Sequence, residues 1–282
     1  LYSSAASDVY KRQVLDPCYD SYEPSVELAG GRCVHVPLAL PDFAVDWQRL
    51  AGAITPRTRL IFINSPHNPS GALLSRADLD QLAALIRGRD IHVISDEVYE
   101  HLIFDGARHA SVLAHEELYA RAFVVSSFGK TYHVTGWKTG YVVAPPALTA
   151  ELRKIHQYVN FCGVTPLQHG LADFMAACPQ HVEELPAFYQ AKRDLFCDLL
   201  AGSRFRFTRA PGTYFQLADY SAIRPDLDDV AMAEWLTREH GVAAIPVSVF
   251  YQQAPAGMRL VRFCFAKREE TLRLAAEKLC AI

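Results

Sequence analysis

The sequence predicts an α/β protein with a mostly parallel sheet in a large domain, followed by a smaller α/β domain at the C-terminus. From Val14 onward, short β-rich runs alternate with helical stretches, which is the pattern of parallel strand–helix–strand units. Half of the residues are hydrophobic and 21% are charged, as in a folded globular chain. The length of 282 residues is enough for about two domains.

The large domain is predicted from runs of aliphatic and aromatic residues. After Val14 and Leu15, strands are expected at residues 32–36, 59–63, 91–94 and 122–125. A helix is expected between the second and third of these runs, because Ser75 and Asp78 have the spacing of a capping box. Leu79, Leu82, Leu85 and Ile86 then share one face, as in a crossover helix that packs on a sheet.

After Pro145 and Pro146 the pattern becomes helical, with helices expected at residues 148–158, 166–177 and 182–200. The smaller domain follows, with a strand at 213–217, a helix at 229–240, a strand at 259–265 and a final amphipathic helix from Glu269. We expect a large domain over residues 14–165, and a helical bridge with the small domain over 166–282. Residues 1–13 lack a starting Met and a clear period, and are expected to be a foreign or disordered start.

Composition excludes several classes of function. The formal charge is −3 and no basic run occurs, so nucleic acid is not an expected partner. No apolar run approaches the ~18 residues of a membrane helix, so no membrane partner is expected. Seven scattered cysteines without a C-x-x-C pair indicate reduced thiols and a cytoplasmic location, without structural zinc. The histidines form no ligand signature, and no metal site is predicted.

Four polar clusters each lie close to an apolar strand, and in α/β sheets ligands bind at the strands' carboxyl ends. The first, residues 64–71, places the amides of Asn64 and Asn68 in a Pro- and Gly-containing loop, for which a plain turn is the alternative. The second contains Asp96 and Tyr99. A carboxylate so close to a core strand needs a cation or hydrogen bonds, and helix capping is the alternative.

The third cluster holds Lys130 and Lys138 among hydroxyls and glycines, a grouping suited to an anion and a reactive amine. It is not a phosphate-binding P-loop, because residue 124 is Val where that motif needs Gly. Solvated surface lysines are the alternative. In the fourth cluster, Arg262 lies inside an apolar strand, where arginine usually meets a carboxylate from a ligand or from an internal ion pair.

Taken together in this order and at these spacings, the clusters resemble the fold-type I, pyridoxal-phosphate (PLP)-dependent aminotransferases of class I and II. The resemblance runs from about Val14 to the C-terminus. Within the family, the sequence is most similar to the methionine and kynurenine aminotransferase branch. The resemblance rests on the strings around Asn68, at 95–99, at 130–138 and at 262–265.

The resemblance implies a role for each cofactor-site residue. Lys130 is expected to bind the PLP aldehyde covalently and then to shuttle a proton. Asp96 is expected to pair with the pyridine nitrogen, and Tyr99 and Asn68 to hydrogen-bond the phenolic oxygen. Ser127 and Lys138 are expected to hold the phosphate, with Lys138 at a position where the wider family commonly has Arg. Tyr19 matches the aromatic residue that stacks on the ring, and simple core packing is its alternative.

Substrate contacts are implied in the same way. Arg262 is expected to bind the substrate α-carboxylate, with Asn68 beside it and Asn64 supporting the loop. Phe161 matches an aromatic residue that lines the pocket across the family's dimer interface, and Tyr214 is expected nearby. The implied reaction is transamination between an amino acid with an apolar or aromatic side chain (methionine, phenylalanine, tyrosine or kynurenine-like) and a 2-oxo acid, in a homodimer.

The chain also departs from the family. Family members are longer, so an N-terminal portion with part of the phosphate cradle is expected to be missing, and weak retention of the cofactor is expected with it. A C–S β-lyase acting on cystathionine-like substrates would use the same residues and is the alternative within the fold. An inactive fragment is the alternative outside enzymes.

Overall fold

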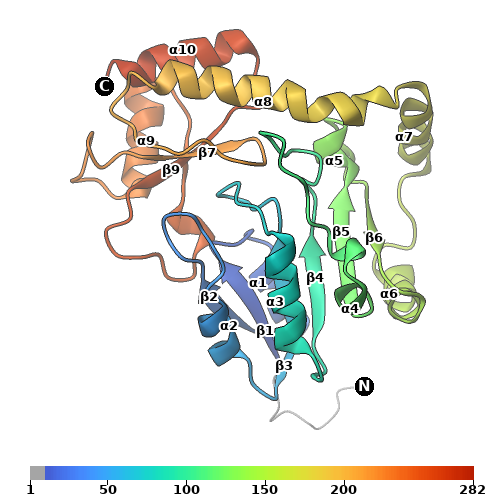
Figure 1. Cartoon of the computed structure of the whole chain (residues 1–282). Helices are drawn as coiled ribbons and strands as arrows, with labels where there is room; N and C mark the ends of the chain where they lie inside the picture. The colour runs from blue at the N-terminus through green and yellow to red at the C-terminus, as the bar shows by residue number, and fades with distance from the viewer. Residues whose placement is uncertain (1–9) are drawn as a thin grey trace.

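The computed structural model describes residues 10–282, so the expectation for residues 1–9 lies outside the described chain. Six strands form one sheet in the order β2-β1-β3-β4-β5-β6, and three form a second sheet in the order β7-β9-β8 (Figure 1). The first five strands are parallel and β6 runs antiparallel to β5, whereas the second sheet is antiparallel. The predicted α/β fold class, with a mostly parallel large sheet and a smaller unit, is confirmed.

The large sheet is formed by residues 11–143. Its strands are β1 (Lys11–Asp16), β2 (Arg32–Pro37), β3 (Thr58–Asn64), β4 (His92–Asp96), β5 (Ala122–Ser127) and β6 (Gly140–Val143). β1 begins three residues earlier than expected, so residues 11–13 belong to the sheet and not to the start segment. Residues 11–13 are polar and therefore lack the apolar pattern of a strand. Gln13 is nevertheless buried, because its side-chain amide donates to Ala53 O (3.0 Å) and Thr58 Oγ1 (2.8 Å).

The helices that cover the large sheet are short, apart from α3. They are α1 (Tyr22–Leu28), α2 (Trp47–Ala53), α3 (Arg76–Ile86), α4 (Glu116–Tyr119) and α5 (Phe128–Thr131). The capping box predicted at Ser75 and Asp78 is present at the start of α3. Leu79, Leu82 and Ile86 are buried against Ile61, Ile63 and Val93 of the sheet. Burial of this apolar face holds α3 on the sheet.

The remaining helices connect the large sheet to the C-terminal unit. They are α6 (Pro146–Val159), α7 (Thr165–Ala177) and α8 (Gln180–Leu200), and α8 runs from α7 to the second sheet (Figure 1). Arg193 of α8 is 1% exposed and donates to both Asp105 carboxylate oxygens, at 2.6 and 2.7 Å. Because Asp105 belongs to the loop after β4, this pair ties α8 to the large sheet.

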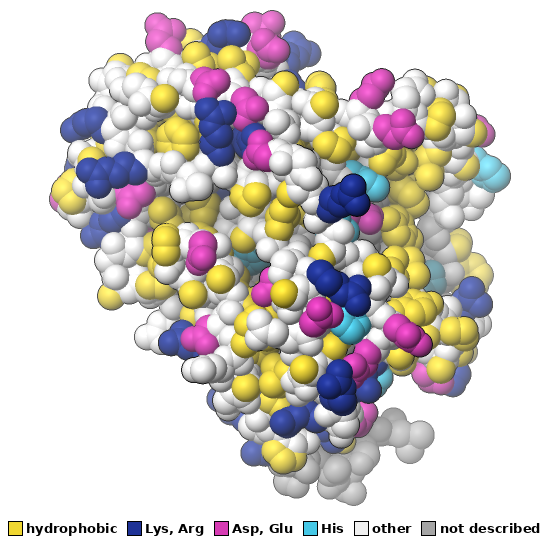
Figure 2. All heavy atoms as spheres, viewed as in Figure 1, with side chains coloured by type: hydrophobic (Ala, Val, Ile, Leu, Met, Phe, Trp, Pro, Cys, Tyr) yellow, Lys and Arg dark blue, Asp and Glu magenta, His cyan; other side chains and the backbone are white. Residues whose placement is uncertain are grey.

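The C-terminal unit consists of β7 (Phe215–Asp219), α9 (Asp229–His240), β8 (Ile245–Pro246), β9 (Leu260–Cys264) and α10 (Glu269–Cys280). Its core joins α8, α9 and α10 to the second sheet through Phe196, Leu236, Phe263 and Leu272. Within residues 10–282, no helix is long and apolar enough to cross a membrane. Charged side chains of both signs are interspersed over the face in Figure 2.

Candidate active site

The four predicted polar clusters meet at the edge where the parallel strands end. Asn64 and Asp96 are register partners at the ends of β3 and β4, and Ser127 ends the neighbouring β5. Arg262 reaches the same place from β9 of the second sheet. The side chains surround a cavity of about 680 Å³, whose lining includes Tyr19, Asn64, Asn68, Asp96, Tyr99, Ser127, Lys130, Lys138 and Arg262.

Asp96 is a partly buried carboxylate at the floor of this cavity. Tyr22 donates its hydroxyl to Asp96 Oδ2 at 2.6 Å, and the Val98 backbone N–H donates to Oδ1 at 3.2 Å. Burial raises the pKa of Asp96, while the hydrogen bonds from Tyr22 and Val98 and the charge of Lys130 act in the opposite direction. A positively charged group in the cavity would favour the carboxylate further.

Arg262 is joined to Asp96 by a chain of hydrogen bonds through two amides. Asn64 Nδ2 donates to the Asp96 carbonyl at 2.9 Å, and Asn64 Oδ1 accepts from the Asn68 backbone N–H at 2.8 Å. Arg262 Nη1 then donates to Asn68 Oδ1 at 2.5 Å. The chain therefore sets the position of the guanidinium relative to the end of β4, which carries the Asp96 side chain.

The Arg262 guanidinium lies between two aromatic rings, with its Cζ 3.9 Å from the Phe215 centroid and 4.8 Å from that of Phe250. Burial lowers the pKa of Arg262, since the charged form loses water. Its Nε is buried without a hydrogen-bond partner among residues 10–282. A buried cation with an unused donor is suited to binding an anion such as a carboxylate.

Lys130 lies on α5, directly after β5. Ser127 caps α5 by accepting the Gly129 N–H at 3.0 Å, which fixes the turn that carries the lysine. Lys130 Nζ lies 5.9 Å from the Tyr99 ring centroid and 5.8 Å from that of Tyr214. The amine therefore projects into the cavity beside aromatic surface and not into bulk solvent.

Ser127 and Lys138 both line the cavity. Lys138 is exposed and has a left-handed backbone with φ of 53°. Gly140 starts β6 close against β5, where an added Cβ would lie 2.7 Å from the Ser126 carbonyl oxygen. The close pairing of β5 with β6 thus brings the Lys138 turn beside Ser127, as the spacing of the third cluster predicts.

The aromatic residues predicted for the site lie at different depths. Tyr19 is 42% exposed at the rim, with its ring edge-on to Tyr22 at 5.7 Å. Tyr99 is buried, and burial together with Tyr214 raises its pKa well above the ordinary value. Tyr214 packs behind Tyr99 at 5.3 Å and is not part of the cavity lining. Phe161 follows α6, is 76% exposed, and does not line the cavity of this chain.

Tyr22 is the site residue that sequence reasoning missed. It is buried and contacts Asp96 directly, and its ring stacks on Phe62 at 5.1 Å. Its signal in the sequence is its position three residues after Tyr19. The pattern does not indicate which of the two tyrosines faces the sheet, because that depends on α1 starting at Tyr22.

Glu97, next to Asp96 in the chain, faces away from the cavity and fastens the following loop. Its oxygens accept from Ser95 Oγ at 2.8 Å and the Val112 N–H at 3.0 Å, and His109 Nε2 lies 2.7 Å away. Burial opposes ionisation of Glu97, but the hydrogen bonds from His109 and Ser111 prevail and lower its pKa. Since both oxygens are occupied, we assign Glu97 a structural role.

Comparison with known proteins agrees with this geometry. Residues 13–279 match the family model described as aminotransferase class I and II. The chain is 53% identical to methionine aminotransferase of Escherichia coli, over 94% of this chain and 68% of that protein. It is 33% identical to kynurenine–oxoglutarate transaminase 1 of Mus musculus, over 95% of this chain and 70% of that protein.

A solved structure of an Escherichia coli protein with a methionine aminotransferase function superposes with a TM-score of 0.94 at 51% identity. The match covers 98% of this chain and 72% of that one. These similarities confirm the resemblance that the four clusters predicted, including its methionine and kynurenine branch. The chain therefore belongs to the class I and II aminotransferase family, with the fold-type I architecture.

Proposed function

We propose that this protein catalyses PLP-dependent transamination between an amino acid with an apolar or aromatic side chain and a 2-oxo acid. The observation that carries the proposal is the convergence of Lys130, Asp96 and Arg262 on one cavity. These residues are an amine, a carboxylate and a guanidinium with a free donor. Methionine is the first candidate for the amino donor, because the relative at 53% identity is a methionine aminotransferase. Phenylalanine, tyrosine and kynurenine are the further candidates.

Aminotransferases of this family depend on PLP, and the donor set of the cavity fits that cofactor. The pyridine nitrogen would contact Asp96. Burial raises the pKa of this carboxyl group, and Lys130 is the cation that acts in the opposite direction. The phosphate would be held by Ser127 and Lys138, and Tyr19 offers a ring at the rim. When bound, PLP supplies an electron sink for the charge that develops at the substrate Cα.

The chain's own residues would then bind, orient and transfer a proton. Arg262 binds the α-carboxylate and, through Asn68, holds it at a fixed position relative to Asp96. The Lys130 Nζ would accept the proton from the substrate Cα and hold it for its return. The Phe215 and Phe250 rings beside the Arg262 guanidinium would reduce its contact with water, which would strengthen this ion pair.

We also propose a homodimer in the cytoplasm. Ile155, Tyr158 and Val159 of α6 are 64 to 85% exposed, and Phe161 follows them. Phe174 and Met175 of α7 add further exposed apolar surface. Large apolar side chains exposed on these two helices are a feature of interfaces. In the proposed dimer, Phe161 would approach the cavity of the other subunit. All seven cysteines are free thiols, as expected in a reducing compartment.

Replacement of Lys130 tests the reaction itself. Lys130→Ala should abolish transamination of methionine with a 2-oxo acid, because the amine that moves the proton is removed, while circular dichroism stays native. Lys154→Ala is the matched control, since Lys154 is an exposed lysine of α6 paired with Glu151. The products are identified by chromatography. Retained transamination in Lys130→Ala would contradict the proposal, as would release of pyruvate and ammonia by the wild type from cystathionine in place of transamination.

Replacement of Tyr22 tests its role as a positioning residue for Asp96. Tyr22→Phe removes the 2.6 Å hydrogen bond that lowers the pKa of Asp96, so that pKa should rise. The acid limb of the profile of kcat/KM against pH should therefore move to higher pH, and kcat should fall about 10-fold. Tyr10→Phe, at an exposed tyrosine stacked on Arg59, should change neither quantity. An unmoved acid limb in Tyr22→Phe would refute the role.

Replacement of Arg262 tests recognition of the α-carboxylate. Losing a buried, charge-assisted contact costs about 2–5 kcal/mol, so Arg262→Ala should lower kcat/KM roughly 30-fold to several thousand-fold. The loss should be equal for methionine, phenylalanine and tyrosine, because all three share the carboxylate. Arg259→Ala, near the start of the same strand, is the control. A loss that differs strongly among the three donors would assign Arg262 to the side chain instead.

A further inference from the structure

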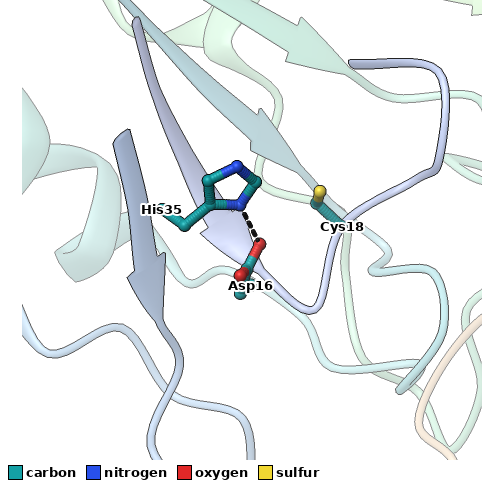
Figure 3. A group of neighbouring side chains, drawn as sticks. All are labelled: Asp16, Cys18 and His35. Atoms are coloured by element: carbon teal, nitrogen blue, oxygen red, sulfur yellow. Dashed lines mark hydrogen bonds and ion pairs between the residues drawn. The ribbon is translucent and has the colours of Figure 1, made fainter. Parts of the chain in front are cut away.

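Asp16, Cys18 and His35 form a second group of chemically reactive side chains, outside the proposed active site. β1 ends at Asp16, Cys18 follows two residues later, and His35 lies on the neighbouring β2. One ligand atom from each residue lies within 4.8 Å of the other two. Figure 3 shows the Asp16 carboxylate facing the His35 ring, with the Cys18 side chain to one side of this pair. His35 Nδ1 and Asp16 Oδ1 are 2.8 Å apart.

The outer contacts of these three residues are those that hold metal ligands in place. His35 Nε2 lies 3.2 Å from Glu23 Oε1, so the far ring nitrogen has a carboxylate partner and Nδ1 faces the group. Asp16 Oδ2 accepts the Gln252 backbone N–H at 3.2 Å, which orients its Oδ1 toward His35. In metal sites, the ring nitrogen of a ligating histidine that does not bind the metal usually contacts a carboxylate, and a ligating carboxylate usually accepts a further hydrogen bond.

The group is buried but lies beside a path to solvent. Asp16 is 2% exposed and Cys18 is 8% exposed. Cys18 also lines a separate cavity of about 300 Å³ between β1, β3 and the loop after β2.

A candidate for the fourth ligand lies on the segment that contacts Asp16. The Tyr251 hydroxyl is buried and has no hydrogen-bond partner among residues 10–282. Gln252, whose N–H donates to Asp16 Oδ2 at 3.2 Å, is the next residue in the chain. This hydroxyl or a water molecule would complete four-coordination.

We propose that Asp16 Oδ1, Cys18 Sγ and His35 Nδ1 bind a divalent zinc-type cation. One thiolate, one imidazole and one carboxylate form a mixed S, N and O donor set that suits tetrahedral Zn²⁺. Binding releases the Cys18 thiol proton and any proton on His35 Nδ1, and the two negative ligands balance the charge of the ion. Sequence patterns do not reveal this site, because the pairing of β1 with β2 creates it.

The proposed site would fasten the C-terminal unit to the large sheet beside the active site. The Cys18 N–H already donates to the Phe250 carbonyl at 2.7 Å, and Phe250 packs on Arg262. An ion held by Asp16 and Cys18 would therefore stabilise the 248–252 segment against β1. It takes no part in the proposed transamination, so this inference does not depend on the proposed function.

Cobalt titration of the whole chain tests the proposal, because Co²⁺ replaces Zn²⁺ and reports a thiolate ligand by charge-transfer absorption. We expect the chelator-treated protein to bind one equivalent of Co²⁺ with this band, and Zn²⁺ to displace it. Cys18→Ser should lose the band, while Cys33→Ser, at another buried cysteine of the same two strands, should keep it. A wild type without the band, or a band retained in Cys18→Ser, would overturn the proposal.

A second series of variants keeps the test independent of the cysteine substitution. Glu23→Gln weakens the support behind His35 and should reduce cobalt affinity roughly 10- to 100-fold. Glu27→Gln, at an exposed glutamate on the same helix, should leave the affinity unchanged. Equal affinities for the two glutamate variants would contradict the support of a metal-bound His35 by Glu23.

Discussion

The chain of hydrogen bonds from Asp96 through Asn64 and Asn68 to Arg262 is the interaction on which the site depends. It connects the two sheets through hydrogen bonds, since Asp96 ends β4 of the large sheet and Arg262 belongs to β9 of the small one. The Asn64 and Asn68 side chains are neutral, so they fix the relative positions of the two residues without adding charge. Any shift of the small sheet therefore moves the guanidinium relative to the carboxylate.

Burial disfavours the charged forms of both the Asp96 carboxylate and the Arg262 guanidinium. Burial raises the pKa of Asp96 and lowers that of Arg262, so each group is pushed toward its neutral form. Their hydrogen bonds and aromatic neighbours recover part of the cost, and the Arg262 Nε has no partner among the residues described. Ligands that bring a cation to Asp96 and an anion to Arg262 would relieve both costs at once. A protonated pyridine nitrogen and an α-carboxylate have these charges.

Much of the fold could be predicted from local signals, and the errors have physical causes. The helix expected at 229–240 matches α9, since Asp228 caps its start and Gly241 adopts a left-handed conformation at its end. The start of β1 at Lys11 was missed because Gln13 is buried through hydrogen bonds and breaks the apolar pattern. The cavity residues were predictable because parallel strands place their carboxyl ends along one edge.

Contacts that depend on tertiary packing could not be predicted in this way. Tyr22, the first residue of α1, contacts Asp96 across 74 positions of the sequence. The group around His35 depends on the register of β1 with β2, which pairs Val14 with His35. Local sequence patterns contain the residue types of these sites, but not the strand pairing that brings them together.

The central claim is that Lys130, and no other lysine, is the residue that would bind the cofactor aldehyde. Borohydride reduction of the protein after incubation with PLP, followed by proteolysis and peptide mass mapping, measures this directly. The account predicts the pyridoxyl mass on the peptide that contains Lys130, in proportion to the cofactor retained. Labelling at Lys138, or labelling spread over surface lysines with Lys130 unmodified, would contradict it.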